Sequence, residues 1–566
     1  MDDMEKKESV ESEAEVKAAE TTDTVEASTE TPKGSHLDEE GILEYDDSNA
    51  SKFDKFFGVT KFGSTIRTEI IAGLVTFLAM CYILTLNPNI IALYSGNAGL
   101  WSSVFIATAF GAIIGTLLMA LLAKMPFAQA SGLGLNAMIM LLLAGNLIPG
   151  KIFSFGASML LVLISGVIFL IVSIVPIGKD KVTGKYVTLR EKIFDGMPVA
   201  IRKAISVGIG LFIAFIGLQN AHVVVDEGTT LVDLVAFNNP ANWTIDYANS
   251  ANTGAALSAI VALFGFVVIA VLSFFKVKGA IIIGVLAATL LAMPLGVANF
   301  NTIAGKTDGI SWVFWENFAN YFKSPEEGGV FFAAFRDIHI YDANTLAEIG
   351  MSFSTVMSCV MIVITFSMID MFDTMGTVVG CATNAGLVDQ NGKPHNYNKI
   401  LLSDSIATAA GALLGTSTVT TFVESGSGIA AGGKTGLTAL STACLFLLAI
   451  FLLPVFAFIP TEACAAALLW VGVLMMANVK DIDFKNPLNS VPAFVTIVFM
   501  PLTYSITDGI GMGVLTYVVI NSVAWVVRFI QFKAGKIEEK PKWDISVISL
   551  VVCALFLVYF FVPVSF

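Results

Sequence analysis

Four acidic residues stand inside apolar stretches of this sequence, where a carboxylate is costly and indicates a functional site. They are Asp370, Asp373, Asp404 and Glu424. Asp370 and Asp373 are three residues apart, so on a helix they share one face. One of them could contact a substrate while the other binds or relays a proton. The acids as a set predict a polar site at membrane depth.

Each acid also has a structural interpretation that needs no ligand. Glu424 could cap the short helix that follows it. Asp404 lies near the start of its predicted helix and could cap neighbouring backbone groups. Asp370 could lie near a helix end in contact with water.

Two similar segments, 127–134 and 422–429, interrupt the apolar stretches with Gly, Ser and one Gln or Glu. The β-branched and aromatic residues before Glu424 favour a short extended stretch. Gly426 and Gly428 then permit a turn into a helix. Because lipid cannot hydrogen-bond to a bare backbone, such breaks survive only where they line a protein cavity. A matched pair of them, one in each half of the chain, indicates a transporter binding site.

The predicted substrate site combines both interrupted segments with Asp373. A carboxylate acceptor, an amide and two Phe rings suit a flat, uncharged heterocycle with hydrogen-bonding groups. The N-terminus of a half-helix would add free N–H donors. The predicted substrate-binding residues are Phe127, Ala128, Gln129, Asp373, Phe422, Val423, Glu424, Ser425 and Gly426.

The composition predicts a polytopic α-helical membrane protein. The 566 residues are 55% hydrophobic and only 14% charged, and the mean hydropathy is +0.78. Soluble domains contain about 25% charged residues. Apolar stretches of about 20 residues recur, and each can cross the hydrocarbon core. They are continuous rather than alternating, which argues against a membrane β-barrel.

The apolar segments divide into two groups of seven and one additional segment. Their approximate bounds are 69–92, 102–123, 133–147, 153–177, 200–217, 257–275, 278–298, 353–380, 398–415, 427–440, 441–459, 463–478, 491–506, 509–530 and 546–565. The third and tenth are short, and each follows an interrupted segment. An odd number of spans turns the second copy upside down, so seven plus seven fits an inverted repeat. Whether 546–565 crosses the membrane stays open.

The acidity of the chain belongs to its N-terminal tail. Residues 1–50 contain 17 Asp and Glu and 4 Lys, which accounts for the whole net charge of −13. This composition predicts an acidic disordered tail. Lys and Arg gather in the loops after even-numbered segments, which places those loops and the N-terminus in the cytoplasm. We expect a multi-pass protein of the cell membrane.

Several other patterns carry no chemistry in this context. Residues 428–435 match the Walker A pattern, but a P-loop requires a preceding strand and a soluble α/β domain. Lys434 more plausibly lies at the cytoplasmic end of the half-helix. The four His lie in the tail or in loops, and the six Cys have no metal-binding spacing. We expect no metal, no cofactor and no enzymatic activity.

The segments 126–129 (Pro-Phe-Ala-Gln), 372–377 (Phe-Asp-Thr-Met-Gly-Thr) and 415–425 resemble those of a known transporter family. This family is the AzgA-like adenine/guanine/hypoxanthine permeases, a branch of the nucleobase–cation symporter-2 (xanthine/uracil permease) family. The resemblance covers about residues 52–530. It implies fourteen segments in a seven-plus-seven inverted repeat, with short unwound or strand segments before half-helices 3 and 10.

The resemblance also implies a division into a core domain and a gate domain. The core domain would comprise 60–177 and 351–459, and the gate domain 198–298 and 460–530. The remaining parts would be the tail 1–50, an extracellular loop 299–350, and a basic linker with an additional hydrophobic segment in 531–566.

Three positions carry over from the resemblance residue by residue. Glu424 matches the tenth-segment Glu that binds the base in related uracil and xanthine permeases. Asp373 matches the eighth-segment Glu or Gln position. Thr377 falls where the uracil permease has a His implicated in proton coupling. This departure leaves the proton carrier open among Asp373, Glu424 and Asp404.

The function implied by this resemblance is proton-coupled uptake of hypoxanthine, guanine and adenine by an elevator-like motion. The alternatives are an anion exchanger of the sulfate or bicarbonate type on the same fold, and a permease for xanthine or uracil. We expect a purine base, protons and membrane lipid as partners and no nucleic acid. A homodimer through the gate domain is compatible with the resemblance.

Overall fold

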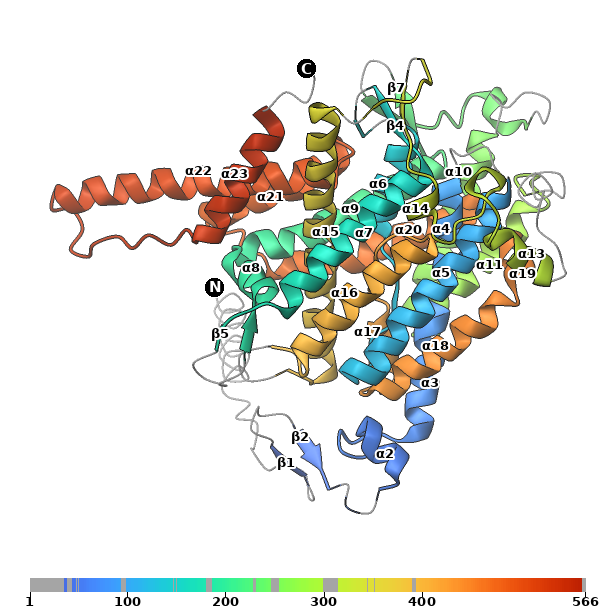
Figure 1. Cartoon of the computed structure of the whole chain (residues 1–566), viewed down its shortest axis with the longest axis horizontal. Coiled ribbons are helices and arrows are strands. Elements are labelled where there is room, and N and C mark those ends of the chain that lie inside the picture. The colour runs from blue at the N-terminus through green and yellow to red at the C-terminus, as the bar shows by residue number, and fades with distance from the viewer. Residues whose placement is uncertain are drawn as a thin grey trace, which may run out of the picture.

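The structure is a computed structural model, and it is predominantly helical (Figure 1). It describes residues 35–37, 43–46, 48, 50–92, 98–145, 147–148, 150–179, 186–227, 231–245, 254–298, 314–343, 345–350, 352–388 and 393–561.

The elements of the first half begin with two helices separated by a break. They are α3 (Ile66–Met80), α4 (Ile83–Ala92), α5 (Ala98–Leu118), the π-helical η1 (Met119–Ala123), β3 (Gln129–Ser131), α6 (Leu133–Leu143), α7 (Phe155–Ile174), α8 (Leu189–Gly196), α9 (Val199–Asn220), α10 (Ala255–Phe274) and α11 (Ala280–Ala292). The second half repeats this order from a long helix onward. Its elements are α15 (Phe353–Ala385), α16 (Tyr397–Leu414), β10 (Val419–Thr421), α17 (Ser425–Ala430), α18 (Gly436–Ile450), α19 (Leu453–Ala457), α20 (Thr461–Met476), α21 (Pro487–Leu502) and α22 (Ile506–Lys533), followed by α23 (Val547–Phe561).

Short elements lie at the ends of the long helices and in the connections. The helical ones are α2 (Lys52–Phe57), η2 (Pro240–Trp243), α13 (Phe314–Tyr321), η3 (Pro325–Glu327), α14 (Ala333–Arg336) and η4 (Ala477–Asp481). Four antiparallel strand pairs join β1 (Ser35–Leu37) to β2 (Leu43–Tyr45), β4 (Lys151–Phe153) to β9 (Ile340–Asp342), β5 (Pro176–Lys179) to β6 (Tyr186–Thr188), and β7 (Val224–Glu227) to β8 (Leu231–Leu234).

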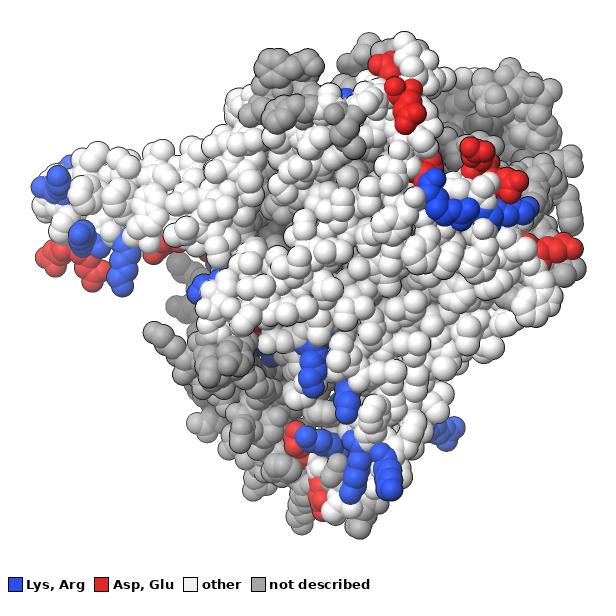
Figure 2. Space-filling model, in the orientation of Figure 1, with Lys and Arg blue, Asp and Glu red and all other residues white. Residues whose placement is uncertain are grey.

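The predicted class of a polytopic helical membrane protein is confirmed. Eight helical stretches among the described residues are long and apolar enough to cross a membrane, and five shorter apolar helices accompany them. Figure 2 shows a broad uncharged belt across the middle of this face, with Lys and Arg gathered along its lower edge. Such a belt matches the apolar thickness of a bilayer between two polar surfaces.

The two halves of the chain meet through their interrupted segments. β3 and β10 pair antiparallel, with Val419 opposite Ser131 and Thr421 opposite Gln129. Each strand is followed directly by a short helix, α6 after β3 and α17 after β10. Equivalent segments that run antiparallel and lead into equivalent helices are the arrangement that an inverted repeat produces.

The long helices pack in two groups. In the first group, α16 packs against α5 and α7, and α18 packs against α3 and α5. In the second, α9 packs against α20 and α21, α10 against α11 and α20, and α22 against α21. Figure 1 shows α22 reaching out to one side of the rest of the molecule, with α23 beside it. The long helices that precede β3 and β10 in the chain, α5 and α16, belong to the first group.

The structure corrects two predicted segments. The tenth is not one half-helix over 427–440: α17 ends at Ala430, and α18 begins at Gly436 with Thr435 as its N-cap. Gly432, at φ +102°, lies between these two helices in the left-handed region that favours glycine. The first segment, 69–92, is likewise interrupted, because α3 ends at Met80 and α4 begins at Ile83.

The structure adds detail at the two ends of the chain. The expected disordered tail lies mostly outside the described residues, but β1 and β2 form a hairpin within it. Lys61 Nζ lies 2.8 Å from a carboxylate oxygen of Glu44 in β2. At the other end, α23 contains 15 residues. A straight helix of that length spans about 22 Å, which is shorter than the hydrocarbon core.

Candidate functional site

The centre of the molecule is the antiparallel pair of β3 and β10. Beyond the strands, Gly132 N donates to Thr418 O at 2.8 Å, and Phe422 N donates to Ala128 O at 3.0 Å. The residues of both strands are buried. The paired strands therefore satisfy each other's backbone groups in the buried interior of the protein. This pairing brings the two predicted interrupted segments together.

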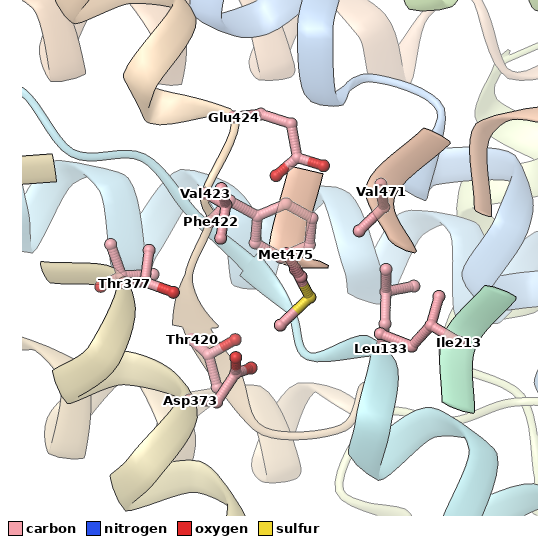
Figure 3. Close-up of a pocket in the computed structure, with 11 residues that line it drawn as sticks. Leu133, Ile213, Asp373, Thr377, Thr420, Phe422, Val423, Glu424, Val471 and Met475 are labelled. Carbon is pink, nitrogen blue, oxygen red and sulfur yellow. The ribbon is translucent and has the colours of Figure 1, made fainter. Parts of the chain in front are cut away.

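A small cavity lies beside β10 and the start of α17 (Figure 3). It is lined by Leu133, Ile213, Asp373, Thr377, Thr420, Thr421, Phe422, Val423, Glu424, Val471 and Met475. Its volume of about 30 Å³ holds one or two water molecules. Four of the predicted substrate-binding residues line it, namely Asp373, Phe422, Val423 and Glu424.

Glu424 occupies the N-cap position of α17, but its side chain makes no cap hydrogen bond. Its carboxylate instead accepts a hydrogen bond from the Tyr82 hydroxyl at 2.7 Å. Tyr82 lies in the break between α3 and α4, and both side chains are buried. The ligand-free interpretation of Glu424 as a helix cap is therefore wrong. Sequence reasoning missed Tyr82, although a phenol inside an apolar segment is itself a polar signal.

Asp373 and Thr377 reach the cavity from α15, one helical turn apart. Figure 3 shows Asp373 and Glu424 entering from different sides, with Phe422 and Met475 between them. The cavity is thus lined by two carboxylates and three threonines around an apolar middle. A planar heterocycle with several polar edges would find acceptors on either side and a ring to pack against.

The amide of Gln129 is held behind the strands and does not line the cavity. Its Nε2 donates to Asp404 Oδ1 at 3.2 Å and to Thr421 Oγ1 at 3.3 Å. The same Asp404 oxygen accepts from Thr374 Oγ1 at 2.7 Å. Gln129 therefore connects the strand pair to the acid on α16.

Asp404 forms a buried ion pair that the sequence did not predict. Arg190 Nη2 lies 2.7 Å from Asp404 Oδ2, and both side chains are 0% exposed. The guanidinium also stacks over the Phe169 ring at 4.5 Å from its centroid. Asp404 lies about two turns inside α16, so the interpretation of this residue as a helix cap is wrong. Arg190, predicted as part of a basic cytoplasmic loop, belongs to the interior.

The interpretation of Asp370 as a solvated residue near a helix end is also wrong. It lies near the middle of the 33-residue α15 and is fully buried. Thr408 Oγ1 of α16 donates to its Oδ2 at 3.2 Å. Asp370 is thus a buried acid behind the cavity.

The remaining predicted residues build the frame of the site. Phe127 is fully buried and lies outside the cavity lining. Ala128 N donates to Ser425 Oγ at 3.0 Å, which ties the first interrupted segment to α17. Gly426 N donates to Val423 O at 2.9 Å in the turn that starts α17. The Phe372 side chain lies outside the described residues.

The Walker-like segment 428–435 binds the side-chain carboxylate of Glu69. The Glu69 carboxylate accepts from Lys434 N at 3.0 Å and from Thr435 N at 3.2 Å. Thr438 Oγ1 of α18 donates to it at 2.6 Å. The carboxylate occupies the position at the helix N-terminus where a nucleotide phosphate would bind in a P-loop. This arrangement explains the pattern without ATP.

A polytopic helical protein with two paired breaks around a central cavity is built as a membrane transporter. The family model of the xanthine/uracil permeases, described as "Permease family", matches residues 67–512. The chain therefore belongs to this family. Its members are permeases, which confirms the expectation of a transporter rather than an enzyme.

Named relatives are similar over most of their length. The chain is 32% identical to "Adenine permease AdeP" of Escherichia coli (strain K12), covering 84% of this chain and 91% of the relative. It is 35% identical to "Guanine/hypoxanthine permease PbuG" of Bacillus subtilis (strain 168), covering 82% and 92%. Among solved structures, the transmembrane domain of the cyanobacterial bicarbonate transporter BicA matches with a TM-score of 0.48 at 15% identity, covering 79% of this chain and 97% of that one.

Proposed function

We propose that this permease takes up purine nucleobases, namely hypoxanthine, guanine and adenine, together with protons. The observation that carries this proposal is the pair of carboxylates, Glu424 and Asp373, that face one cavity beside paired strands. Purines present ring and exocyclic N–H donors, which require acceptors in a buried site. The relatives named as adenine and guanine/hypoxanthine permeases support the same substrate class.

The Tyr82 hydroxyl supports a specific role for Glu424. It binds one carboxylate oxygen, Oε1, at 2.7 Å. The other oxygen is then available for a ring N–H of the base, and Phe422 can pack against the ring face. Asp373 would accept a second donor from the opposite side. A flat base would be recognised at two edges and one face.

The walls of the cavity support an elevator-like motion of one helix group past the other. The polar lining residues come from β10, α15 and the start of α17, whereas Ile213, Val471 and Met475 come from α9 and α20 of the second group. Apolar side chains make no hydrogen bonds with a bound base, so sliding past them breaks few interactions. The cavity is also too small for a purine and must widen for binding. We assign the first group to the core domain and the second to the gate domain.

Proton coupling is proposed at Asp373, because it is the second acid that faces the cavity. Two carboxylates around one small space, of which Glu424 is buried and Asp373 is partly exposed, favour proton uptake, since like charges repel. Asp404, a further candidate, is bound by Arg190, Thr374 and Gln129. Its contacts suit a fixed charge that positions Gln129 behind the strands.

An anion exchanger is the second candidate function, and the cavity argues against it. Its lining contains two carboxylates, and none of the lining residues in the described chain is Lys or Arg. An anion would meet repulsion rather than a counter-charge. A xanthine or uracil permease differs from our proposal only in the base, and one hydrogen-bonding group can reverse such a preference.

Uptake by proteoliposomes tests this proposal. Vesicles with an imposed inward proton gradient should accumulate labelled hypoxanthine, and a protonophore should abolish the accumulation. Unlabelled adenine and guanine should compete, whereas xanthine, uracil and sulfate should not. Uptake of labelled sulfate, or accumulation that requires sodium or survives the protonophore, would contradict the proposal.

Membrane orientation and assembly complete the proposal. We place the N-terminus in the cytoplasm because of the Lys and Arg pattern of the loops. We also propose a homodimer through the gate domain, where α22 exposes Val519, Val523, Val527 and Ile530. Mass measurement of the protein in lipid nanodiscs should give two copies, and a monomer would contradict the dimer.

A further inference from the structure

Asp370 is a buried acid that the proposed substrate site does not use. It precedes Asp373 by one turn of α15, and its side chain is 0% exposed. Its Oδ2 accepts from Thr408 Oγ1 at 3.2 Å. Its Oδ1 has no hydrogen-bond partner within the described part of the chain. An ionised carboxylate at membrane depth normally has several donors or a cation.

The nearby cation is already paired with another acid. The charged groups that act on Asp370 are Asp404 of α16, Arg190 of α8 and Asp373 of its own helix. Arg190 directs Nη2 to Asp404 at 2.7 Å, and its Nη1 donates to Leu401 O and to a serine hydroxyl. The Arg190–Asp404 pair is neutral, so Asp370 has no counter-ion of its own. Protonation is the remaining way to keep this buried carboxyl group uncharged.

We propose that Asp370 is the proton-binding site of the transport cycle and holds the proton behind the cavity after it enters through Asp373. This inference rests on the proposed proton-coupled uptake and deepens it. In the transfer, the proton leaves the Asp373 carboxyl group and binds an oxygen of Asp370, and no other covalent bond changes. Asp373 remains the group that faces both the base and the entering proton.

Thr408 connects the protonation state of Asp370 to the strand that leads to Glu424. Its single hydroxyl proton has two acceptors, Asp370 Oδ2 at 3.2 Å and Val419 O of β10 at 3.2 Å. When Asp370 is ionised, Thr408 donates to the carboxylate and leaves Val419 O without that donor. When Asp370 is protonated, it donates to Thr408, which is then free to donate to Val419 O. A protonation change therefore alters a hydrogen bond of β10.

Replacing Asp370 by Asn tests the inference, because Asn imitates the neutral acid but cannot release a proton. Asp370→Asn should bind hypoxanthine with wild-type affinity and exchange it across the membrane. It should lose accumulation against a gradient, and its exchange rate should no longer vary with pH. Asp373→Asn is the comparison variant, since it should weaken hypoxanthine binding as well as lose accumulation.

A second variant covers the case in which Asp370→Asn does not fold. Thr408→Val keeps the acid and the side-chain shape but removes the hydroxyl that links it to Val419. It should bind purine and transport fewer protons per purine than the wild type. Accumulation and pH dependence equal to wild type in either variant would overturn the role of Asp370.

The outcomes also separate this inference from the proposed function. If wild-type uptake ignores the proton gradient, the proposed coupling itself fails. If wild-type uptake follows the gradient and Asp370→Asn still accumulates hypoxanthine, only the assignment of the proton to Asp370 fails.

Discussion

Replacing Tyr82 by Phe removes one hydroxyl and tests whether the phenol orients Glu424. The Tyr82 hydroxyl donates to Glu424 Oε1 at 2.7 Å, and both groups are buried. A hydrogen bond to a charged group contributes about 1.5–3 kcal/mol. If that free energy holds the carboxylate toward the base, its loss should raise the dissociation constant for hypoxanthine by roughly 10- to 150-fold.

The assay is equilibrium binding of labelled hypoxanthine to purified protein in nanodiscs, together with thermal unfolding of the same samples. Tyr321→Phe is the matched control. The Tyr321 hydroxyl donates to Leu414 O at a distance of 2.8 Å, and neither residue lines the cavity. Each variant loses one tyrosine hydrogen bond. Both should be somewhat less stable than the wild type, but only Tyr82→Phe should lose affinity for the base.

Equal affinities in Tyr82→Phe, Tyr321→Phe and the wild type would refute the reasoning. Glu424 would then be oriented by its backbone position alone. A loss of affinity in both variants would point to a general effect of destabilisation rather than to the Tyr82–Glu424 contact.

Three further predictions concern the frame of the site. Arg190→Leu leaves Asp404 buried and unpaired and should cost about 3–5 kcal/mol of unfolding free energy; thermal unfolding should show this loss, and removing both charges should restore part of it. Glu69→Gln removes the charge that accepts the N–H groups of 428–435, so it should lower the unfolding temperature, and ATP should shift that temperature in neither protein. Gly428→Ala places a Cβ 2.0 Å from a threonine oxygen of α3 and should cost about 1–3 kcal/mol, whereas Gly426→Ala meets no heavy atom of the described chain within 4 Å and should express normally in fluorescence size-exclusion. Equal behaviour of the two glycine variants, an unchanged Arg190→Leu protein, or an ATP-dependent shift would contradict these accounts.

The interrupted segments could be predicted because their signal is local. Glycines and polar residues inside an apolar stretch break a helix wherever they occur, and lipid forces the exposed backbone to find partners within the protein. Two such breaks in matching positions can satisfy each other. The antiparallel pairing of β3 and β10 follows this expectation.

The contacts around the site could not be predicted, because they depend on how distant helices pack. Tyr82 reaches Glu424 across 342 positions of sequence, through a break in its own helix. The spacing of Asp370 and Asp373 predicts that they share a helix face. It does not predict which residues of other helices pack against that face. Arg190 lies in the loop after the fourth predicted segment, so the sequence predicts that it is solvated. The rule that places basic loops in the cytoplasm does not distinguish solvated from buried Lys and Arg.

The end of α17 follows a local sequence signal that the prediction did not use. The pair Gly432 and Gly433 favours a chain break, yet the apolar residues on either side suggested one continuous half-helix. The Glu69 carboxylate, far away in sequence, stabilises the break by accepting hydrogen bonds from the N–H groups of Lys434 and Thr435, which directly precede α18.

The most direct test of the central claim is the affinity of Glu424→Gln for hypoxanthine, measured with purified protein beside the wild type and the exposed-loop variant Glu348→Gln. Gln keeps the shape of the side chain but replaces a carboxylate oxygen by an amide donor, where the base needs an acceptor. We predict that Glu424→Gln inserts and folds but loses high-affinity binding, while Glu348→Gln binds as the wild type does. Wild-type affinity in Glu424→Gln would contradict the claim that this carboxylate binds the base.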